Sequence, residues 1–403
     1  MDRRILAAAV CLLLASTALS AAPGDVTSVV FDRSIPAAEI DSLAVALFEN
    51  SEPPGARYDV DVFLIEYETT DLDGTPTPSL LQLFVPRLSE PDERPMYVFG
   101  TGSTGLVDAC RPSREHLVDI EWGLYRTHVL AHAGQGTIGV MPDYMNFSVT
   151  GEIQPYFISV AEGRVMLDAI RAARSYIAGT DYFAQPAPGA FVAGYSQGGH
   201  AAFATADLRD EYAPEVELAG IIGYGPSTDI FNLFREFTVS IPLVVYSYAT
   251  FYGEDRFDPS LVLADRWLDS LAHDVTSMCI GAVQRFYPRE PEPLYRPEFT
   301  DALLNGTMRE DYPGIARLME INSSGLSGHG IPALILEGTE DTVVSLESQT
   351  EFVGRLCDAG SAVRYIVYEG ARHDTRQVGF ADAVEWMYAI AGGEPAPSDC
   401  SEY

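Results

Sequence analysis

Short apolar runs alternate along the chain with longer stretches in which apolar residues recur at helical spacing. The first two runs, residues 58–69 and 79–86, alternate polar and apolar positions, as strands at an antiparallel edge of a sheet do. Six later runs are apolar throughout, as in buried parallel strands: 94–100, 136–144, 189–196, 217–225, 331–338 and 362–370. Helical patterns lie between them at 114–132, 158–178, 198–212 and 380–392. Strands that alternate with helices predict an α/β fold with a mostly parallel sheet.

The alternation stops between about residues 226 and 328, where only IPLVVYSYATFYG (241–253) has the pattern of a strand. The rest of this stretch is helical in pattern, so we expect a helical cap inserted over the carboxyl edge of the sheet. The α/β core would then comprise residues 22–225 and 329–403. Aromatic residues are dense early in the cap, and we expect most of them to form its own core and some to line a substrate channel.

The first residues have the pattern of a secretory signal peptide. Arg3 and Arg4 precede an apolar run at 5–15, and Ala18-Leu19-Ser20-Ala21 supplies the small residues of a cleavage site. The run is too short for a transmembrane helix, and no other run approaches the ~18 apolar residues that a membrane span needs. We expect residues 1–21 to form a signal peptide that is cleaved near residues 20–22. The mature protein would then be secreted or periplasmic and would have no transmembrane span.

Four cysteines follow the predicted signal peptide: Cys110, Cys279, Cys357 and Cys400. An even number in an exported chain indicates two disulfides, for which three pairings are possible. Their wide spacing does not match the paired short intervals of a zinc site. We expect neither a metal nor a cofactor.

The formal net charge of −33 restricts the partners of the protein. Such a charge disfavours binding to nucleic acid or to an anionic membrane. It would also repel a substrate with several negative charges, so we expect a neutral or weakly charged one. The sequence contains no signal for an oligomer, and a monomer is the default.

A candidate nucleophile lies in Gly194-Tyr195-Ser196-Gln197-Gly198. Ser196 ends an apolar run and opens a helical one, which is the strand–turn–helix context of a nucleophile elbow. The turn is so tight that side chains at 194 and 198 would clash. The helix N-terminus also favours negative charge that develops beside the serine. We predict that Ser196 is the nucleophile.

A serine nucleophile needs a base and a carboxylate that orients the base. In this fold the acid and then the histidine follow the serine along the chain. Asp341 comes just after the run at 331–338, and His373 comes just after the run at 362–370. Both positions fall at the carboxyl edge of the sheet, where open α/β sheets bind ligands. The predicted triad is therefore Ser196, Asp341 and His373.

Three other carboxylates lie near these positions. Glu337 falls inside the predicted strand and Glu340 is one residue out of register, so both are weaker candidates for the acid than Asp341. Asp374 follows His373 directly and cannot easily fold back to its neighbour's ring.

Other histidines have simpler interpretations. His200 lies one helical turn after Ser196, and we expect a packed or hydrogen-bonded helix residue. His128 and His132 are spaced i, i+4, but the sequence THVLAH lacks the glutamate of a zinc-protease helix.

An oxyanion hole must stabilise the tetrahedral intermediate. Gln197, the residue after the nucleophile, would supply one backbone N–H. A second would come from a loop at the end of a neighbouring strand, for which TGSTG (101–105) and MPDYMNF (141–147) are both candidates.

Several motifs together resemble the family of secreted lipases typified by Candida antarctica lipase A and its bacterial relatives: GYSQGGHAA (194–202), DACRPS (108–113), MPDYMNF (141–147), GTED (338–341) and GARH (370–373). The likeness runs from about residue 60 to Cys400 and is weakest in the cap. It implies an α/β-hydrolase with a helical cap before the acid-bearing strand. It also implies hydrolysis of acylglycerols and other carboxylic esters.

The resemblance extends to individual residues. It implies that Asp143 gives the second oxyanion N–H, that Cys110 pairs with Cys279, and that Cys357 pairs with Cys400. The chain departs from the pattern in two loops, with Thr101 where relatives often carry histidine and Met145-Asn146-Phe147 where glycines often follow.

The function that these residues predict is that of a secreted serine carboxylester hydrolase, a triacylglycerol lipase or carboxylesterase. It would cleave acylglycerols or related neutral esters through an acyl-enzyme. A serine peptidase or amidase on the same fold is the alternative enzyme. A binding protein on a hydrolase scaffold that has lost its chemistry is the alternative from another class.

Overall fold

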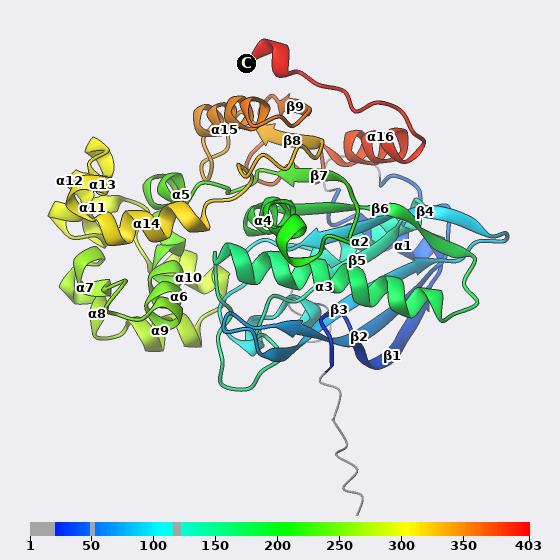
Figure 1. Ribbon diagram of the computed structural model, residues 1–403, viewed down its shortest axis with the longest axis horizontal. Helices are drawn as coiled ribbons and strands as arrows, with labels where there is room; N and C mark the ends of the chain where they lie inside the picture. Colours follow the sequence, from blue (N-terminus) through cyan, green and yellow to red (C-terminus); the bar gives the residue numbers. More distant parts are fainter. Residues whose placement is uncertain (1–20, 49–52, 116–121) are drawn as a thin grey trace, which may run out of the picture.

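The alternating and the continuous apolar runs all join one sheet. The computed structural model describes residues 21–48, 53–115 and 122–403 (Figure 1). In these ranges nine strands lie in the order β1-β2-β3-β5-β4-β6-β7-β8-β9. The pairs β1–β2, β2–β3 and β3–β5 are antiparallel, and all the following pairs, from β5–β4 to β8–β9, are parallel. The strands are β1 (Val26–Ile35), β2 (Val60–Thr70), β3 (Pro76–Pro86), β4 (Asp92–Gly100), β5 (Ile138–Pro142), β6 (Ala184–Tyr195), β7 (Leu218–Tyr224), β8 (Ala333–Gly338) and β9 (Val363–Tyr368).

Every predicted strand outside the cap is confirmed, whereas β1 lies outside all of the predicted strands. β1 forms the edge of the sheet and is exposed along most of its length, so it lacks the apolar alternation that marks a half-buried strand. Its backbone pairing with β2, where Val29 lies opposite Ile65, keeps it in the sheet. The predicted α/β fold with a mostly parallel sheet is confirmed.

The parallel strands are buried on both faces because helices cover each side. Along β6, Val192 packs into the core on one face, whereas Phe191 and Ala193 pack into the core on the other. This double burial explains why these runs contain no polar alternation. The first face is covered by α3 (Ser159–Ala178), α4 (Gln197–Tyr212) and α15 (Leu346–Asp358), and the second by α1 (Ala37–Ala44), α2 (Tyr125–Gly134) and α16 (Phe380–Ala391).

The helix predicted at 114–132 begins later than expected. Pro112–Arg114 forms a short 3₁₀ turn, and α2 starts at Tyr125 after Leu124, whose φ of 54° is left-handed. Residues 116–121 of the predicted helix lie outside the described residues. The helices predicted at 158–178, 198–212 and 380–392 begin and end within one residue of their predicted positions.

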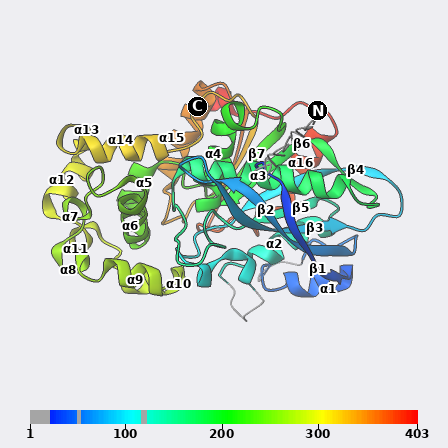
Figure 2. The same ribbon diagram turned by 60° about the horizontal axis from the view of Figure 1, so that its bottom comes forward.

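Between β7 and β8 the chain forms a run of helices, which we call the helical segment (residues 226–328). In both views these helices gather at one side of the molecule, away from α1 (Figures 1 and 2). Most of the second large apolar core lies within this segment. Its helices are α5 (Ile230–Glu236), α6 (Ile241–Tyr252), α7 (Pro259–Val262), α8 (Asp265–Leu268), α9 (Leu271–Ser277), α10 (Ile280–Phe286), α11 (Pro291–Leu294), α12 (Pro297–Asn305), α13 (Met308–Asp311) and α14 (Pro313–Asn322).

The strand proposed at IPLVVYSYATFYG is wrong, because this run forms α6. A continuous apolar run does not distinguish a buried strand from a buried helix. Pro242 fits the first helical turn, where no intrahelical N–H is required. Ile241 to Val245 are buried, whereas Tyr246 and Ala249–Tyr252 are partly or fully exposed, so the first turn of α6 is buried on all sides and its last turn reaches the surface.

Two disulfides join distant segments in the pairs that the family resemblance implied. Cys110 bonds Cys279, which ties the helical segment to the loop after β4, and Cys357 bonds Cys400. Both pairs have Cα atoms 5.5 Å apart. None of the helices in the described ranges combines the length and hydropathy that spanning a bilayer requires.

Candidate active site

Ser196 occupies a strained turn between β6 and α4. Its φ of 55° and ψ of −115° are unusual for a residue with a side chain, and such strain clusters at functional sites. Hydrogen bonds fix the turn: Ser196 N donates to Tyr224 O at 3.1 Å, and Ser196 O accepts from Ser227 N and His200 N at 3.2 Å each. The serine therefore sits at the carboxyl end of β6 and at the N-terminus of a sixteen-residue helix.

The elbow leaves no room for side chains at its two glycines. A Cβ on Gly194 would lie 1.9 Å from the carbonyl oxygen of Gly198, and a Cβ on Gly198 would lie 1.8 Å from that of Gly100. Both distances are far below van der Waals contact, and both obstacles are backbone atoms. The Gly-x-Ser-x-Gly spacing is thus a steric requirement of this turn.

Asp341 and His373 meet at the carboxyl ends of β8 and β9. His373 Nδ1 lies 2.7 Å from Asp341 Oδ2. The other carboxylate oxygen accepts the backbone N–H groups of Val343 at 2.6 Å and Val344 at 3.0 Å. Burial opposes ionisation of Asp341, but its hydrogen bond to His373 and the charge of that ring outweigh burial and lower the pKa of Asp341.

The second ring nitrogen of His373 is free to act. With the Nδ1 proton directed at Asp341, Nε2 is the basic nitrogen. Nε2 is buried and has no hydrogen-bond partner among the described residues. His373 and Ser196 line the same cavity. Gly225 makes room for the ring, because a Cβ there would lie 3.0 Å from His373 Nδ1.

The cavity has a volume of about 410 Å³ and walls from both the core and the helical segment. Apolar side chains from each part face it, among them Trp122, Phe237 and Ile280. Gln284 and Arg289 add polar groups. This mixture of apolar walls and a few polar groups is typical of small-molecule sites.

Sequence reasoning missed a charged pair in the cavity wall. Arg376 bonds Asp374 at 2.5 Å and Gly123 O at 2.6 Å, and its guanidinium carbon lies 4.9 Å from the ring centre of Tyr125 and 4.8 Å from that of Tyr195. Burial opposes ionisation of Asp374, but Arg376 outweighs it and lowers the pKa of Asp374. The only signal in the sequence was the proximity of HDTR to the predicted base.

The backbone N–H of Asp143, which the family resemblance implied as an oxyanion donor, is engaged in a hydrogen bond of the sheet. It donates to Leu80 O at 2.8 Å, because the chain continues the β3–β5 ladder past Pro142. The side chain points to a different partner and accepts Ser113 N at 2.7 Å and Ser113 Oγ at 2.5 Å. Burial raises the pKa of Asp143 to about 6, although the bonds to Ser113 oppose the shift.

The other loop that the sequence offered lies beside the serine. Ser103 lines the cavity with Ser196. The backbone N–H groups of Gly102 and Ser103 donate no hydrogen bond to any part of the described chain. A Cβ on Gly102 would lie 2.7 Å from the Tyr195 ring, so this loop passes close to the elbow. Gln197 N stands at the first position of α4, as expected.

The remaining carboxylates are occupied or remote. Glu337 is fully buried, and burial together with the charge of Asp341 raises the pKa of Glu337 to about 10. It accepts Gly338 N at 3.0 Å. Glu340 is exposed. Neither therefore competes with Asp341 for the His373 ring.

His128, His132 and His200 are buried, and none of them lines the cavity. His200 contacts Glu162 and Asn322 through its two ring nitrogens. His128 and His132 pack in the core, where burial lowers the pKa of both, that of His132 to about 3. Within the described ranges, no group of three or more His, Cys, Asp or Glu side chains is arranged to hold a metal ion.

The sheet and the helices on both its faces define an α/β-hydrolase fold. The sequence profile of the secretory lipase family matches residues 115–399, and the chain belongs to this family. The resemblance seen in the motifs is thereby confirmed. Family membership makes the protein a hydrolase of the lipase and esterase class.

Individual relatives are distant in sequence. The trichothecene C-3 esterase of Fusarium sporotrichioides is 23% identical over 347 residues, which cover 80% of this chain and 73% of that protein. The rice cell wall degrading esterase LipA from Xanthomonas oryzae has a similar structure, with a TM-score of 0.73, 18% identity, and coverage of 92% of this chain and 97% of that one. Candida antarctica lipase A has a TM-score of 0.68 and 18% identity, over 94% of this chain and 84% of that one.

Proposed function

We propose that the protein hydrolyses neutral carboxylic esters through an acyl-enzyme on Ser196. The observation that carries this proposal is the His373–Asp341 pair, 2.7 Å apart, in which Nε2 has no partner among the described residues and the histidine lines the same cavity as Ser196. A serine on a strained elbow, a histidine base and a buried carboxylate are the three parts that such chemistry needs.

In the first half-reaction, His373 Nε2 accepts the Ser196 Oγ proton while Oγ bonds to the ester carbonyl carbon. Asp341 holds the imidazolium that forms, and two backbone N–H groups hold Asp341 in turn. When the tetrahedral intermediate collapses, Nε2 gives its proton to the departing alcohol oxygen. The ester C–O bond breaks, and the acyl group remains on Ser196.

In the second half-reaction, a water molecule takes the place of the alcohol. His373 Nε2 accepts its proton as the hydroxyl oxygen bonds to the acyl carbon. Collapse then releases the carboxylic acid, and the same proton returns to Ser196 Oγ. No redox change occurs, so the residues named suffice for the balance of atoms and charge.

The oxyanion would lie between Gln197 N, at the start of α4, and the N–H groups of Gly102 and Ser103. The free N–H groups of the loop after β4 support this arrangement, and they replace Asp143 in the proposal. The N-terminus of α4 adds a favourable dipole. Removal of one such donor typically costs about 10²–10³ in rate.

The helical segment (residues 226–328) serves as a cap in this proposal. Its residues Phe237, Val239 and Ile280 meet core residues across the cavity, so the acyl or alcohol part of a substrate would lie between the two. Acylglycerols and related neutral esters fit the apolar walls, and the net charge of −33 disfavours multiply anionic substrates. The two disulfides support export, with residues 1–21 as the signal peptide.

The test is hydrolysis of p-nitrophenyl esters with acyl chains from two to sixteen carbons, by the wild type and by Ser196→Ala. We expect activity in the wild type and a loss of about 10⁴-fold or more in the variant, with unchanged thermal unfolding. The corresponding p-nitroanilide should be a much poorer substrate. Equal rates in wild type and variant, or faster cleavage of the anilide, would reject the proposal.

A further inference from the structure

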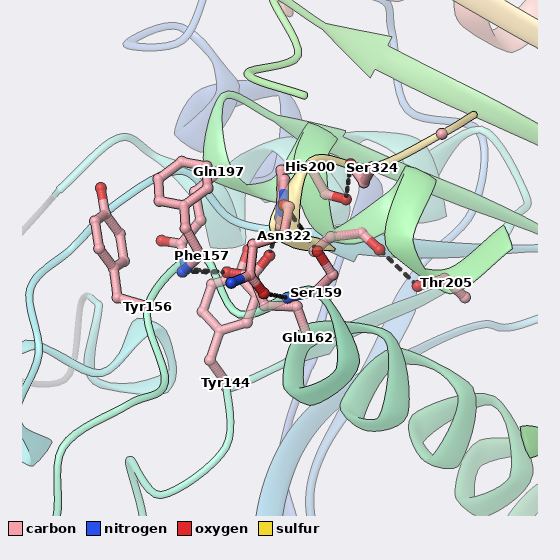
Figure 3. Close-up of polar contacts among 12 residues, drawn as sticks. Tyr144, Tyr156, Phe157, Ser159, Glu162, Gln197, His200, Thr205, Asn322 and Ser324 are labelled. Carbon is pink, nitrogen blue, oxygen red and sulfur yellow. Dashed lines mark hydrogen bonds and ion pairs between the residues drawn. The ribbon is translucent and has the colours of Figure 1, made fainter. Parts of the chain in front are cut away.

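A buried polar cluster lies directly behind the proposed oxyanion site. Figure 3 shows the side chains of Gln197, Glu162 and His200 converging from α4 and α3, with Asn322 of α14 beside the histidine. Glu162 and His200 are 1% and 0% exposed, and neither lines the cavity. The proposed chemistry does not use them, yet His200 follows the nucleophile by one helical turn.

Both ring nitrogens of His200 face oxygen acceptors. Nε2 lies 2.5 Å from the carbonyl oxygen of Asn322, which can only accept, and Nδ1 lies 2.5 Å from Glu162 Oε2. The Glu162 carboxylate also accepts Gln197 Nε2 at 2.8 Å and Phe157 N at 3.2 Å on its other oxygen. The Glu162 carboxyl group therefore has three partners, two of which, Gln197 and His200, belong to the first turn of α4.

Glu162 thus contacts two side chains of the first turn of α4. One oxygen binds the side chain of Gln197, and the other binds the ring of His200 one turn later. The backbone N–H proposed for the oxyanion belongs to Gln197 itself. Its direction depends on how this first turn is held, because a helix terminus has no preceding turn to fix it.

The same cluster reaches the second half of the oxyanion site. Gln197 Nε2 also donates to Gln154 Oε1 at 3.1 Å. Gln154 in turn donates its side-chain amide to Gly105 O and its backbone N–H to Leu106 O, the latter at 2.9 Å. Both acceptors lie in the loop after β4 that carries Gly102 and Ser103. A chain of hydrogen bonds thus runs from Glu162 to each proposed source of oxyanion N–H groups.

Neighbouring residues tie the cluster to the rest of the fold. Phe157, whose N–H Glu162 accepts, has a φ of 53°, and Tyr156 beside it bonds Ser103 Oγ at 2.5 Å. On the other side, Ser159 Oγ donates to Asn322 O at 2.8 Å, so the end of the helical segment joins the same cluster.

We infer that Glu162 and His200 are positioning residues for ester hydrolysis, a hydrogen-bonded pair that holds the Gln197 N–H and the loop after β4 in the geometry that binds the oxyanion. The inference rests on the proposed function. The pair would act on the transition state through the N–H groups that it positions. The cavity walls, and not this pair, would bind the substrate.

The test compares Glu162→Gln with the wild type on a p-nitrophenyl ester and on the matching thionoester, in which sulfur replaces the carbonyl oxygen. Sulfur accepts hydrogen bonds weakly, so the ester-to-thionoester ratio of kcat reports on the oxyanion site. We expect Glu162→Gln to lower kcat on the ester about 10²-fold with KM changed less than about threefold. The ratio should fall about tenfold, because the thionoester has less oxyanion stabilisation to lose.

Asp168→Asn is the matched control. Asp168 is another buried carboxylate of α3 with three side-chain partners, Thr69, Arg171 and Tyr212, and it does not touch the first turn of α4. This variant should keep the wild-type ratio even if it is less stable. A purely structural role for Glu162 would lower both rates equally, through a smaller folded fraction, with the ratio unchanged.

A second variant, Gln197→Met, tests the same inference if Glu162→Gln does not fold. Gln197→Met removes the side-chain bonds to Glu162 and Gln154 but keeps the backbone N–H and the volume of the residue. It should lower the ratio in the same direction. An unchanged ratio in the folded variants, with an active wild type and an inactive Ser196→Ala, would overturn the inference and leave the proposed function intact. An inactive wild type would instead overturn the proposed function, and this inference with it.

Discussion

At the scale of single residues, the site combines steric and electrostatic constraints that reinforce one another. Ser196 accepts a positive φ because two glycines let backbone segments approach within contact of each other. Behind Asp341, Glu337 is held as a neutral acid, since burial and the charge of Asp341 both oppose its ionisation. A second negative charge is thereby kept away from the base.

Glu337 makes the stability of the fold depend on pH. Its pKa is 4.5 in the unfolded chain and about 10 in the folded one, so between these values the unfolded chain loses a proton that the folded chain keeps. The contribution of Glu337 to the free energy of unfolding is fully present below about pH 4.5, and it is lost as the pH rises toward 10. Glu337→Gln should match the wild type near about pH 5 and exceed it at higher pH, by at most about 1.4 kcal/mol per unit.

Urea unfolding at about pH 5 and about pH 8 measures this gap. Glu340→Gln, at an exposed position, is the control and should show no such gap. A Glu337→Gln variant whose advantage shrinks with rising pH would contradict the neutral state of Glu337.

At the scale of elements, α10 depends on a covalent link. It starts at Ile280, directly after Cys279, and Ile280 N donates to Thr104 O at 2.8 Å. Ile280, Gly281 and Gln284 all face the cavity. The Cys110–Cys279 bond thus fixes one wall of the cavity against the loop that supplies the proposed oxyanion N–H groups.

Loss of this disulfide should change substrate binding as well as stability. Cys110→Ser/Cys279→Ser should raise KM for p-nitrophenyl esters several-fold, whereas Cys357→Ser/Cys400→Ser should leave KM unchanged. Both changes should lower the melting temperature, because the closed loops of 169 and 43 residues are worth about 5 and about 4 kcal/mol in the chain-entropy model. Equal KM values in the two double variants would show that the first disulfide does not shape the cavity.

The sequence indicated elements better than it indicated contacts. The continuous apolar runs located the buried strands, and the elbow motif located Ser196, because both patterns follow from local geometry. α6 was missed because its apolar run has no period that separates helix from strand. Glu162 and Gln154 gave no signal, since their partners on α4 and after β4 are distant in the chain and meet only in the fold.

At the scale of the whole molecule, charge is the dominant feature. With 58 acidic and 25 basic residues, the folded surface repels itself, and compaction brings these charges closer together. Salt screens this repulsion over a Debye length of about 10 Å at 0.1 M. Repulsion between acidic residues therefore lowers the free energy of unfolding of this protein.

The melting temperature should therefore rise by a few degrees between about 0.01 M and about 0.5 M NaCl at neutral pH. Calorimetry at about pH 5 provides the comparison, since the net charge falls toward zero near the sequence pI of 4.3. The increment should be smaller there. An increment of the same size at both pH values would show that net repulsion does not limit stability.

The position of the proposed base on the outermost parallel strand has a consequence for the timing of folding. Ser196 follows β6 near the middle of the sheet, whereas His373 follows β9, which is the last strand of the described sheet and pairs with β8. More than a hundred residues of helical segment separate the two halves of the sheet along the chain, and such non-local pairing is slow. The turn that holds Ser196 can thus form before β9 has paired with β8 and brought His373 to the site. During refolding, the rate at which ester hydrolysis recovers would therefore report the rate at which β9 joins the sheet.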